Sequence, residues 1–512
     1  MGLSKSLYVN GIQCHKLMWL SKHRKGDERV FEPNASLEAI FERGNEVGEL
    51  ACELFAGGER IKWENSTFDE KIAQTSELIA KGTRYIYEAT FSFKGALIMV
   101  DILEILPSGE LVINEVKSST INPSRPQPNE AYLNDIAFQY FVLASLGYNV
   151  KNVNLICLNS DYIRGDELDI HQLFYILDLT QNAKEQFNSI KENVEHFEKI
   201  LEQKDEPKRD IGIQCGKPHE CEAKNYCWGQ AGALVEGSVF DIALLGGKQK
   251  FNRQTLFELF HNNIKTIDEI KNFDKIPPYF LTQIKAHQQK LRIVDKNAIR
   301  EFLSTLSYPI YHLDFETFQI AIPLWRGTKP YEQIPFQYSL HIDKGDGSAP
   351  THKEFLPNEF CDPRLQLAER LVNDIPKDVC VLAYNAKFEK GVLKSLASIF
   401  PNLAEHLIAI HDNIKDLMLP FDKRYFYDYK QNGGYSIKDI QPILAPSIDE
   451  GYKALKAKGE ISNGGEAMQA FPSFKDKSVD EIQELRKQLL AYCGLDTLAM
   501  VKVLEGLKEL VE

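Results

Sequence analysis

Strand-like patterns dominate the first part of the chain after one long helical pattern. Residues 85–106, YIYEATFSFKGALIMVDILEIL, are rich in β-branched and aromatic residues on both sides of Lys94-Gly95, which favours a hairpin that turns at this dipeptide. The sequence PSG at 107–109 turns the chain again, so residues 110–117 are predicted to form the next strand. Upstream, residues 35–56 repeat apolar positions at intervals of three and four without proline, which predicts a helix.

Helical patterns fill the middle of the chain. Between residues 178 and 210, apolar residues form one stripe at helical spacing, which predicts a long packed helix with a solvated charged face. Residues 251–290 contain two short helical patterns that are loosely similar to helix-hairpin-helix-like segments, and a helical linker is the simpler interpretation. A new α/β pattern opens after residues 297–307, where SYPIYHLDFETF reads as a strand.

Length and composition are those of a multidomain globular protein. A chain of 512 residues exceeds one hydrophobic core, and 43% hydrophobic with 26% charged residues is ordinary for such proteins. We expect an α/β protein with domains at 1–235, 236–300 and 301–512. The first twenty residues lack a long apolar run, and no later stretch reaches the length of a membrane span, so we expect a cytoplasmic protein without a membrane partner.

The charge of the chain bears on its partners. A formal net charge of −13 argues against a protein that grips nucleic acid through a global basic field. It does not exclude a nuclease, because metal-binding carboxylates count as negative until their cations bind. Any contact with nucleic acid is then expected from local Lys and Arg patches and would be salt-sensitive.

One strand ends in a pair of opposite charges. In LVINEVKSS, Glu115 and Lys117 are two residues apart and therefore share a strand face, while Asp101 lies one strand away. An Asp on one strand beside a Glu and a Lys on its neighbour forms a compact site for one or two divalent cations. The E-x-K triplet alone is equally compatible with a surface ion pair.

The motifs V-D-I-L and I-N-E-V-K-S-S together resemble the PD-(D/E)xK nuclease superfamily, in particular its RecB-like branch, and imply a restriction-endonuclease-like fold. In that family the Asp and Glu ligate Mg or Mn and the Lys positions the nucleophilic water. These roles carry over to Asp101, Glu115 and Lys117. The following helix, NDIAFQYFVLASLGYNV, is similar to the Gln-bearing helix of the branch and places Gln139, with Tyr140 as a second candidate, near the site.

Three of the nine cysteines cluster in CGKPHECEAKNYCWG. Cys215, Cys221 and Cys227 have the spacing C-x5-C-x5-C, and Cys14 precedes them by two hundred residues. Such thiols in a cytoplasmic chain suggest a metal site. Zinc, with His219 able to replace one thiolate, and an iron-sulfur cluster are both compatible with these ligands.

A distant N-terminal cysteine and a C-terminal triplet that bracket a RecB-like core resemble the iron-sulfur nucleases of CRISPR adaptation and recombinational repair. The resemblance implies a 4Fe-4S cluster that ties the ends of the domain together through Cys14, Cys215, Cys221 and Cys227. The first interval is longer than in many relatives, so zinc remains the alternative. The other cysteines, Cys52, Cys157, Cys361, Cys380 and Cys493, are predicted to be core residues.

The second half carries another ordered set of acids. Asp314 and Glu316 share a strand face, which suits two bridged cations. The stretch VCVLAYNAKFEKGVLKSLA reads as strand, turn and helix and holds Glu389, while LLAYCGLDTLAMVKVL is a helix with Tyr492 and Asp496 on one face. Asp416, at a predicted strand end, is a further candidate acid, although a structural role explains it better. The insertion 421–470 offers Tyr435 to stack a base and Lys438 to meet a phosphate, which ordinary loop chemistry explains equally well.

The order D-x-E, N-x-x-F-E, Y-x3-D resembles the DEDDy exonucleases and implies an RNase H-like fold. By that resemblance Asp314, Glu316 and Asp496 ligate two Mg or Mn ions, and Tyr492 orients the attacking water. Glu389 stands where the family has Asp, which lengthens the carboxylate by one methylene. The pairing of an iron-sulfur RecB-like nuclease with a DEDDy-type domain, joined by a small helical segment, resembles an uncharacterised bacterial family over nearly the full length.

The expected function is a two-site nuclease that hydrolyses phosphodiester bonds in DNA, with RNA possible at the second site, in repair, recombination or defence. A helicase or repair partner is expected by analogy only. The alternative is a weak or inactive nuclease-fold scaffold that binds nucleic acid, which the Glu389 departure and the acidic charge motivate. A third interpretation is a zinc-stabilised protein unrelated to nucleic acid.

Overall fold

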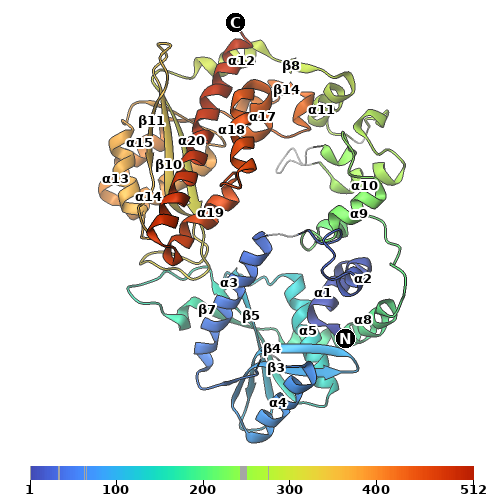
Figure 1. The fold of residues 1–512 in the computed structure, drawn as a ribbon. Helices are drawn as coiled ribbons and strands as arrows, with labels where there is room; N and C mark the ends of the chain where they lie inside the picture. The colour runs from blue at the N-terminus through green and yellow to red at the C-terminus, as the bar shows by residue number, and fades with distance from the viewer. Residues whose placement is uncertain (1, 33–34, 63, 65, 243–250, 275) are drawn as a thin grey trace. The chain divides into compact units, whose positions relative to one another are not determined.

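The structure is a computed structural model that describes residues 2–32, 35–62, 64, 66–242, 251–274 and 276–512, with side chains for all of these except 35–42. It is a mixed α/β protein, as the mixture of periodicities predicts, and it forms two compact units rather than three separate domains (Figure 1). Unit 1 comprises Met1–Leu234 and Ile320–Glu332, and unit 2 comprises Val235–Gln319 and Gln333–Glu512. Residues 236–300, expected to be a linker, group with unit 2.

Unit 1 is built on a seven-stranded mixed sheet with the order β2-β3-β4-β5-β6-β7, to which β1 adds by pairing with β4. Its strands are β1 (Leu3–Ser4), β2 (Glu59–Arg60), β3 (Tyr85–Phe93), β4 (Ala96–Ile105), β5 (Leu111–Ile121), β6 (Val150–Asn159) and β7 (Phe174–Asp178). Its helices are α1 (Lys5–Gln13), α2 (His15–His23), α3 (Ala35–Cys52), α4 (Phe68–Lys81), α5 (Glu130–Ser145), α6 (Ile170–Leu173), α7 (Thr180–Glu185), α8 (Phe187–Leu201) and α9 (Lys224–Ala231).

The predicted hairpin is confirmed as β3 and β4. Lys94 and Gly95 both have positive φ, of 46° and 84°, as a two-residue hairpin turn of type I′ requires. The main core of the unit lies between one face of the sheet and α1, α2, α5 and α8, and the predicted apolar stripe of α8 is buried there. A smaller core lies under α3 and includes Val47 and Ala51.

The segment 320–332 returns from unit 2 to unit 1. There the Tyr331 hydroxyl donates a hydrogen bond to the carbonyl of Ser118 (2.7 Å), and the backbone of Arg164 pairs with that of Gly327 and Thr328. The chain therefore leaves β9 (Ile310–Phe318) of unit 2, contributes a segment to unit 1 that contacts β5, and re-enters unit 2 at β10 (Ile334–Asp343).

Unit 2 contains a five-stranded sheet with the order β11-β10-β9-β12-β13, in which β9 is central. Pairing is antiparallel among β9 (Ile310–Phe318), β10 (Ile334–Asp343) and β11 (Thr351–Phe355), and parallel among β9, β12 (Cys380–Ala383) and β13 (Ile414–Asp416). A two-stranded sheet pairs β8 (Arg292–Val294) with β14 (Phe426–Asp428).

Unit 2 contains the helices that cover its larger sheet together with other helices. They are α10 (Arg253–His261), α11 (Pro278–Gln289), α12 (Lys296–Ser304), α13 (Arg364–Asp374), α14 (Lys387–Ile399), α15 (Pro401–Asn413), α16 (Leu419–Asp422), α17 (Ile437–Leu444), α18 (Pro446–Ala457), α19 (Gly464–Ser473) and α20 (Val479–Glu509). Leu313 and Phe315 of β9 pack with α13, α14 and α15 in one core. The opposite face of β9 and β10 is covered by α20 (Figure 1).

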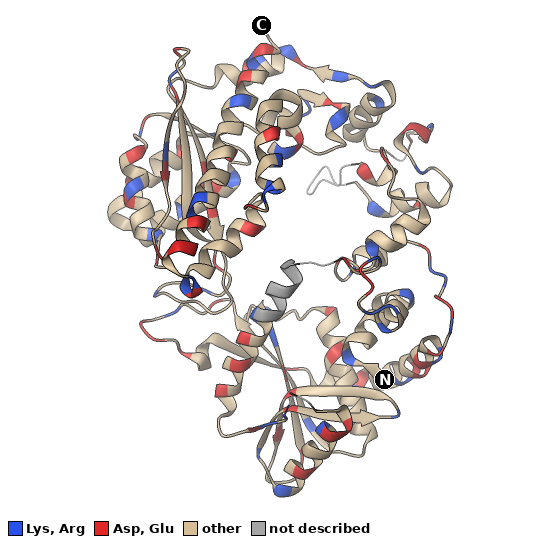
Figure 2. Ribbon diagram, viewed as in Figure 1, with Lys and Arg blue, Asp and Glu red and all other residues tan. Residues whose placement is uncertain are grey.

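Two general features bear on partners. None of the described helices is both long and apolar enough to cross a bilayer. Basic and acidic residues are interspersed along the elements of both units (Figure 2), so electrostatic recognition has to come from local clusters.

Candidate metal centres

The acids of unit 1 lie where two strands separate. Strands β4 and β5 are paired from Ile105 and Leu111 as far as Ile102 and Asn114, so Asp101 and Glu115 are the first residues beyond the paired stretch. The backbone N–H of Val116 donates to Asp101 Oδ2 across this fork (2.7 Å). The divergence leaves room for side chains between strands that would otherwise be joined by backbone hydrogen bonds.

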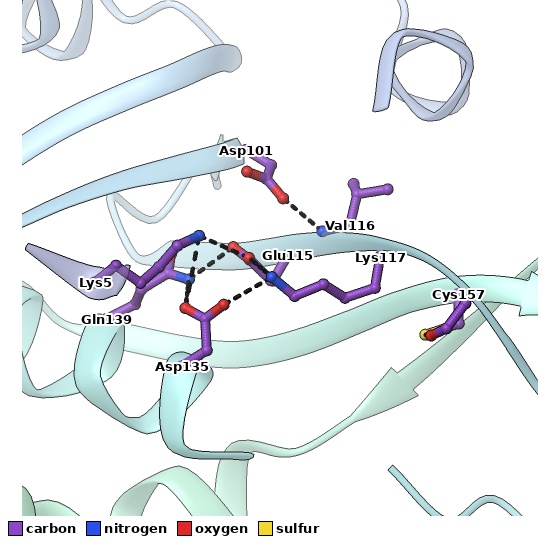
Figure 3. A network of polar contacts seen from close by, with 9 residues as sticks. Lys5, Asp101, Glu115, Val116, Lys117, Asp135, Gln139 and Cys157 are labelled. Atoms are coloured by element: carbon purple, nitrogen blue, oxygen red, sulfur yellow. Dashed lines mark hydrogen bonds and ion pairs between the residues drawn. The ribbon is translucent and has the colours of Figure 1, made fainter. Parts of the chain in front are cut away.

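Glu115 is fully buried and accepts hydrogen bonds on both oxygens (Figure 3). Its Oε1 receives the ammonium groups of Lys117 (2.6 Å) and Lys5 (2.7 Å), and its Oε2 receives Nε2 of Gln139 (2.7 Å). Asp135, one turn before Gln139 on α5, accepts from Lys117 (2.7 Å) and from Gln139 (3.1 Å). The network joins β5, α1 and α5.

Burial and charge shift the acids of this network in opposite directions. Burial and then the nearby charge of Glu115 raise the pKa of Asp101 to about 7. Burial alone would also raise the pKa of Glu115, but the ammonium groups of Lys117 and Lys5 hold it below the usual value. Burial and then Glu115 raise the pKa of Asp135 as well, so the lysines compensate Asp101 and Asp135 less completely than Glu115, a condition that favours a bound cation.

These acids open into a cavity of about 430 Å³. Its lining includes Lys5, Glu88, Asp101, Glu115 and Lys117. Glu88 adds a half-buried carboxylate from β3, held at a φ of 61°, and burial raises its pKa. Most of the residues that line the cavity are polar or charged.

The structure brings Asp101, Glu115, Lys117 and Gln139 together, whereas Tyr140 packs edge-on against Phe187. Two members of the network were missing from the sequence prediction. Asp135 was detectable, since it lies four residues before Gln139 and therefore on the same helical face. Lys5 was not, because its approach depends on the pairing of β1 with β4, which no local pattern predicts.

The four predicted cysteine ligands line one small cavity, of about 20 Å³, in unit 1. Cys14 joins α1 and α2, Cys215 and Cys221 are in the loop before α9, and Cys227 is within α9. The side chain of Gln13 ties the N-terminal helix to this loop by donating to the carbonyls of Gln214 (2.9 Å) and His219 (3.0 Å). His219 itself is exposed and does not line the cavity.

The spacing of these sulfurs bears on the choice of metal. Three ligand atoms within 4.8 Å of one another mark a compact group that could hold one metal ion. Among the described residues, Asp314, Glu316 and Cys493 form such a group, and no three of the four cysteine sulfurs do. Four thiolates on one tetrahedral zinc, with Zn–S of about 2.3 Å, lie about 3.8 Å apart. Burial and then the neighbouring thiols of the group raise the pKa of Cys221, which shows that the four sulfurs lie near one another.

The acids of unit 2 lie on the sheet face that α20 covers. In the β9–β10 register Asp314 is opposite Ser339 and Glu316 is opposite Gln337. Both of these β10 residues contact α20. The hydroxyl of Ser339 is hydrogen-bonded to Thr497 Oγ1 (2.6 Å), and the side chain of Gln337 donates to the carbonyl of Leu489 (2.8 Å). Asp314 and Glu316 therefore face the helix that supplies Asp496.

Glu316 and Asp496 are buried, Asp314 is half-buried, and the charges of the three carboxylates repel one another. Burial, and then the charge of Asp496, raise the pKa of Asp314 well above its usual value. Burial and the charges of Asp314 and Asp496 do the same to the pKa of Glu316, and burial raises the pKa of Asp496. No ammonium group contacts them as Lys117 contacts Glu115 among the described residues, so protons or a cation must offset their charge.

Two tyrosines and a lysine complete the surroundings of Asp496. The hydroxyl of Tyr452 donates to Asp496 Oδ1. Lys438 donates to the hydroxyl of Tyr492 (3.3 Å) and lies over the rings of both tyrosines, at 5.4 and 5.1 Å. Lys438 and Tyr452 also line a cavity of about 940 Å³ between α17, α18, α19 and α20. Tyr435, expected to stack a base, lies beside Arg424, whose Cζ is 5.6 Å from the centre of the ring.

Glu389 of α14 and Asp416 of β13 extend this acidic group. Glu389 is almost fully buried at the start of α14, its Oε2 has no partner among the described residues, and burial and then Asp314 raise its pKa well above the usual value. Asp416 accepts from the backbone N–H groups of Asn385 (3.0 Å) and Met418 (2.9 Å), which supports the structural role.

One residue that was assigned to the core belongs to this site. Cys493 is buried, as predicted, but its thiol donates to Asp314 Oδ2 (3.7 Å) and lies within 4.8 Å of a carboxylate oxygen of each of Asp314 and Glu316. Its position three residues before Asp496, on one helical face, was the available signal.

Comparison with known proteins gives two matches. Residues 311–436 match a family described as a domain of unknown function (DUF2779). The chain is also 26% identical over 311 residues to Uncharacterized protein MG366 of Mycoplasma genitalium, an alignment that covers 55% of this chain and 44% of the relative. The chain thus spans less than half of the length of this relative.

Proposed function

We propose that the chain is a metal-dependent nuclease with two separate hydrolytic sites, one in each unit. The observation that carries the proposal is that buried and half-buried carboxylates from distant parts of the chain converge twice, without enough positive charge to offset them. The two sets are Asp101 and Glu115 beside Lys117, and Asp314, Glu316 and Asp496. Such oxygen ligands suit Mg²⁺ or Mn²⁺.

In unit 1, Asp101 and Glu115 hold the cation and Lys117 orients the attacking water. The bound metal supplies Lewis acidity and offsets the charge that develops on the phosphorane-like transition state. Gln139 donates a hydrogen bond from Nε2 to Glu115 Oε2 and so holds the carboxylate in one orientation. The fork between β4 and β5 and the helix α5 beside it support a restriction-endonuclease-like fold of the RecB-like type.

In unit 2, Asp314, Glu316 and Asp496 hold the cations and Tyr492 orients the water. A central strand with D-x-E and a long helix that returns with Y-x3-D support the RNase H-like, DEDDy-type assignment. Glu389 is the fourth acid, because its carboxylate is close enough to Asp314 for each charge to influence the other.

Cys14, Cys215, Cys221 and Cys227 hold a 4Fe-4S cluster in this proposal, with zinc as the alternative. The lining of one small cavity by all four cysteines supports a shared metal centre. It ties α1 and α2 to the loop before α9, and therefore joins the first and last parts of unit 1.

The test is a cleavage assay with end-labelled single-stranded DNA, duplex DNA and single-stranded RNA in Mg²⁺ or Mn²⁺. Asp101→Asn, Asp314→Asn and the double variant are compared with Asp378→Asn, which changes an exposed acid without a resolved role. We expect each single variant to lose one activity and the double variant to lose both. Cleavage that survives in the double variant would refute the proposal.

The rival function is a nucleic-acid-binding scaffold with weak or no turnover. Glu389, one methylene longer than the usual acid, is the observation in its favour. Tight, metal-independent binding of the same DNA without product would support this rival. A DNA substrate and a repair or helicase partner belong to the proposal by resemblance only.

A further inference from the structure

Lys5 enters the site of unit 1 from a strand that fills the fork between β4 and β5. Strand β3 occupies one edge of β4 along its length, so the parallel pairing of Leu3 and Ser4 with Ala96 and Leu97 uses the edge that faces β5. Lys5 follows immediately as the first residue of α1, whose N-cap is Ser4. The backbone is thus fixed on both sides of Lys5, and its side chain points toward Glu115 (Figure 3).

Two ammonium groups share one oxygen of Glu115. Lys5 and Lys117 lie 2.7 and 2.6 Å from Oε1, and a carboxylate oxygen has two lone pairs. A cation that binds Oε1 must therefore displace one of the two lysines.

Lys5 is the more weakly held of the two. Lys117 has a second close carboxylate, Asp135 at 2.7 Å, while Lys5 lies 3.5 Å from that residue. Both lysines line the cavity, so a displaced Lys5 remains beside the cation.

We propose that Lys5 occupies the place of the cation on Glu115 in the free protein and, when the cation binds, turns to a non-bridging oxygen of the substrate phosphodiester. This inference rests on the proposed nuclease function of unit 1. The hydrogen-bonded network and Asp101 supply three carboxylates and two ammonium groups. A bound dication leaves one positive charge, which a phosphodiester offsets.

Manganese binding, measured by electron paramagnetic resonance, tests the first half without any turnover. The full chain carries Asp314→Asn to silence the second site, and Lys5→Met is compared with Lys151→Met, which removes an exposed lysine of β6. Loss of the competing ammonium should tighten Mn²⁺ binding roughly tenfold in Lys5→Met only. Unchanged or weaker binding in that variant, with the melting curve preserved, would overturn the proposal.

The salt dependence of binding to a fluorescein-labelled oligonucleotide in Ca²⁺ tests the second half. In Lys5→Met, loss of one phosphate contact should reduce the slope of log K against log salt by about 0.7 to 0.9. Lys5→Arg keeps the positive charge and should restore the slope. The same variant shows whether a positive charge at this position suffices for folding. An unchanged slope in Lys5→Met overturns the phosphate contact alone. Failure of the wild-type protein to bind or cleave any oligonucleotide overturns the proposed function and the contact together.

Discussion

Neutralising one acid of unit 2 should stabilise the metal-free protein. In Asp314→Asn the amide has nearly the shape of the carboxylate, and its oxygen still accepts the hydrogen bond of the Cys493 thiol. The substitution removes a charge that faces Glu316 and Asp496 in a buried setting. The folded protein therefore loses a repulsion that the unfolded chain does not experience.

The magnitude follows from the distance between the acids. Oxygen atoms of Asp314 and Glu316 lie within 4.8 Å of one another. At an effective dielectric constant of about 20, two unit charges at that distance repel by about 3.5 kcal/mol. Partial protonation of the acids relieves part of this repulsion. We therefore expect the free energy of unfolding of Asp314→Asn to be about 2 kcal/mol higher than that of the wild type at pH 8, which corresponds to about 4 to 6 °C in the apparent Tm of unit 2.

The assay is thermal unfolding, measured first in EDTA and then again in about 1 mM Mn²⁺, which is about a tenfold excess over the chelator. Wild-type protein should gain stability from Mn²⁺, and Asp314→Asn should gain much less because a ligand is missing. Asp378→Asn should match the wild type in both conditions within about 0.5 kcal/mol. The reasoning is refuted if Asp314→Asn is less stable than wild type in EDTA, or if Mn²⁺ stabilises both proteins equally.

Two other predictions concern the cysteines and a buried histidine. Anaerobically purified protein should contain iron and sulfide; Cys221→Ser should lose most of the iron, and Cys361→Ser, outside the group, should keep it. Equal iron content in the two variants, or zinc in the wild type, would contradict the cluster. Burial and then the ring of His352 lower the pKa of His341 from 6.5 to about 4. As the pH falls, the unfolded chain therefore protonates this imidazole before the folded protein does, and the free energy of unfolding should decrease between pH 6.5 and pH 4. In urea unfolding, His341→Asn should reduce the slope of the free energy of unfolding against pH by at most about 1.4 kcal/mol per pH unit. An unchanged slope would exclude His341 as the source of the pH dependence.

Local patterns were sufficient where one element decides the structure. The β-branched run around Lys94-Gly95 predicted the hairpin, and alternation predicted that Glu115 and Lys117 share a strand face. The spacing of Tyr492 and Asp496 placed both on one face of α20. In each case the periodicity of a single strand or helix carries the information.

The missed residues depend on pairings between distant segments. Lys5 reaches Glu115 only because β1 adds to the free edge of β4, and a two-residue strand has no periodicity to detect. Cys493 was assigned to the core because burial of a thiol is common. Burial was correct, but the same helix turn also faces Asp314, and only the packing of α20 on β9 shows that.

The two sites offset the charge of buried acids by different means, and this predicts different responses to metal removal. In unit 1, Lys5 and Lys117 hold Glu115 ionised, so most of the charge is balanced within the protein itself. In unit 2 the pKa values of the acids are all raised, and the closest polar donor to Asp496 is the uncharged hydroxyl of Tyr452. Because neutral donors offset charge less than ammonium groups do, unit 2 relies on protons or cations. Chelation should therefore destabilise unit 2 more than unit 1, and most strongly at high pH, where protons no longer substitute for the metal.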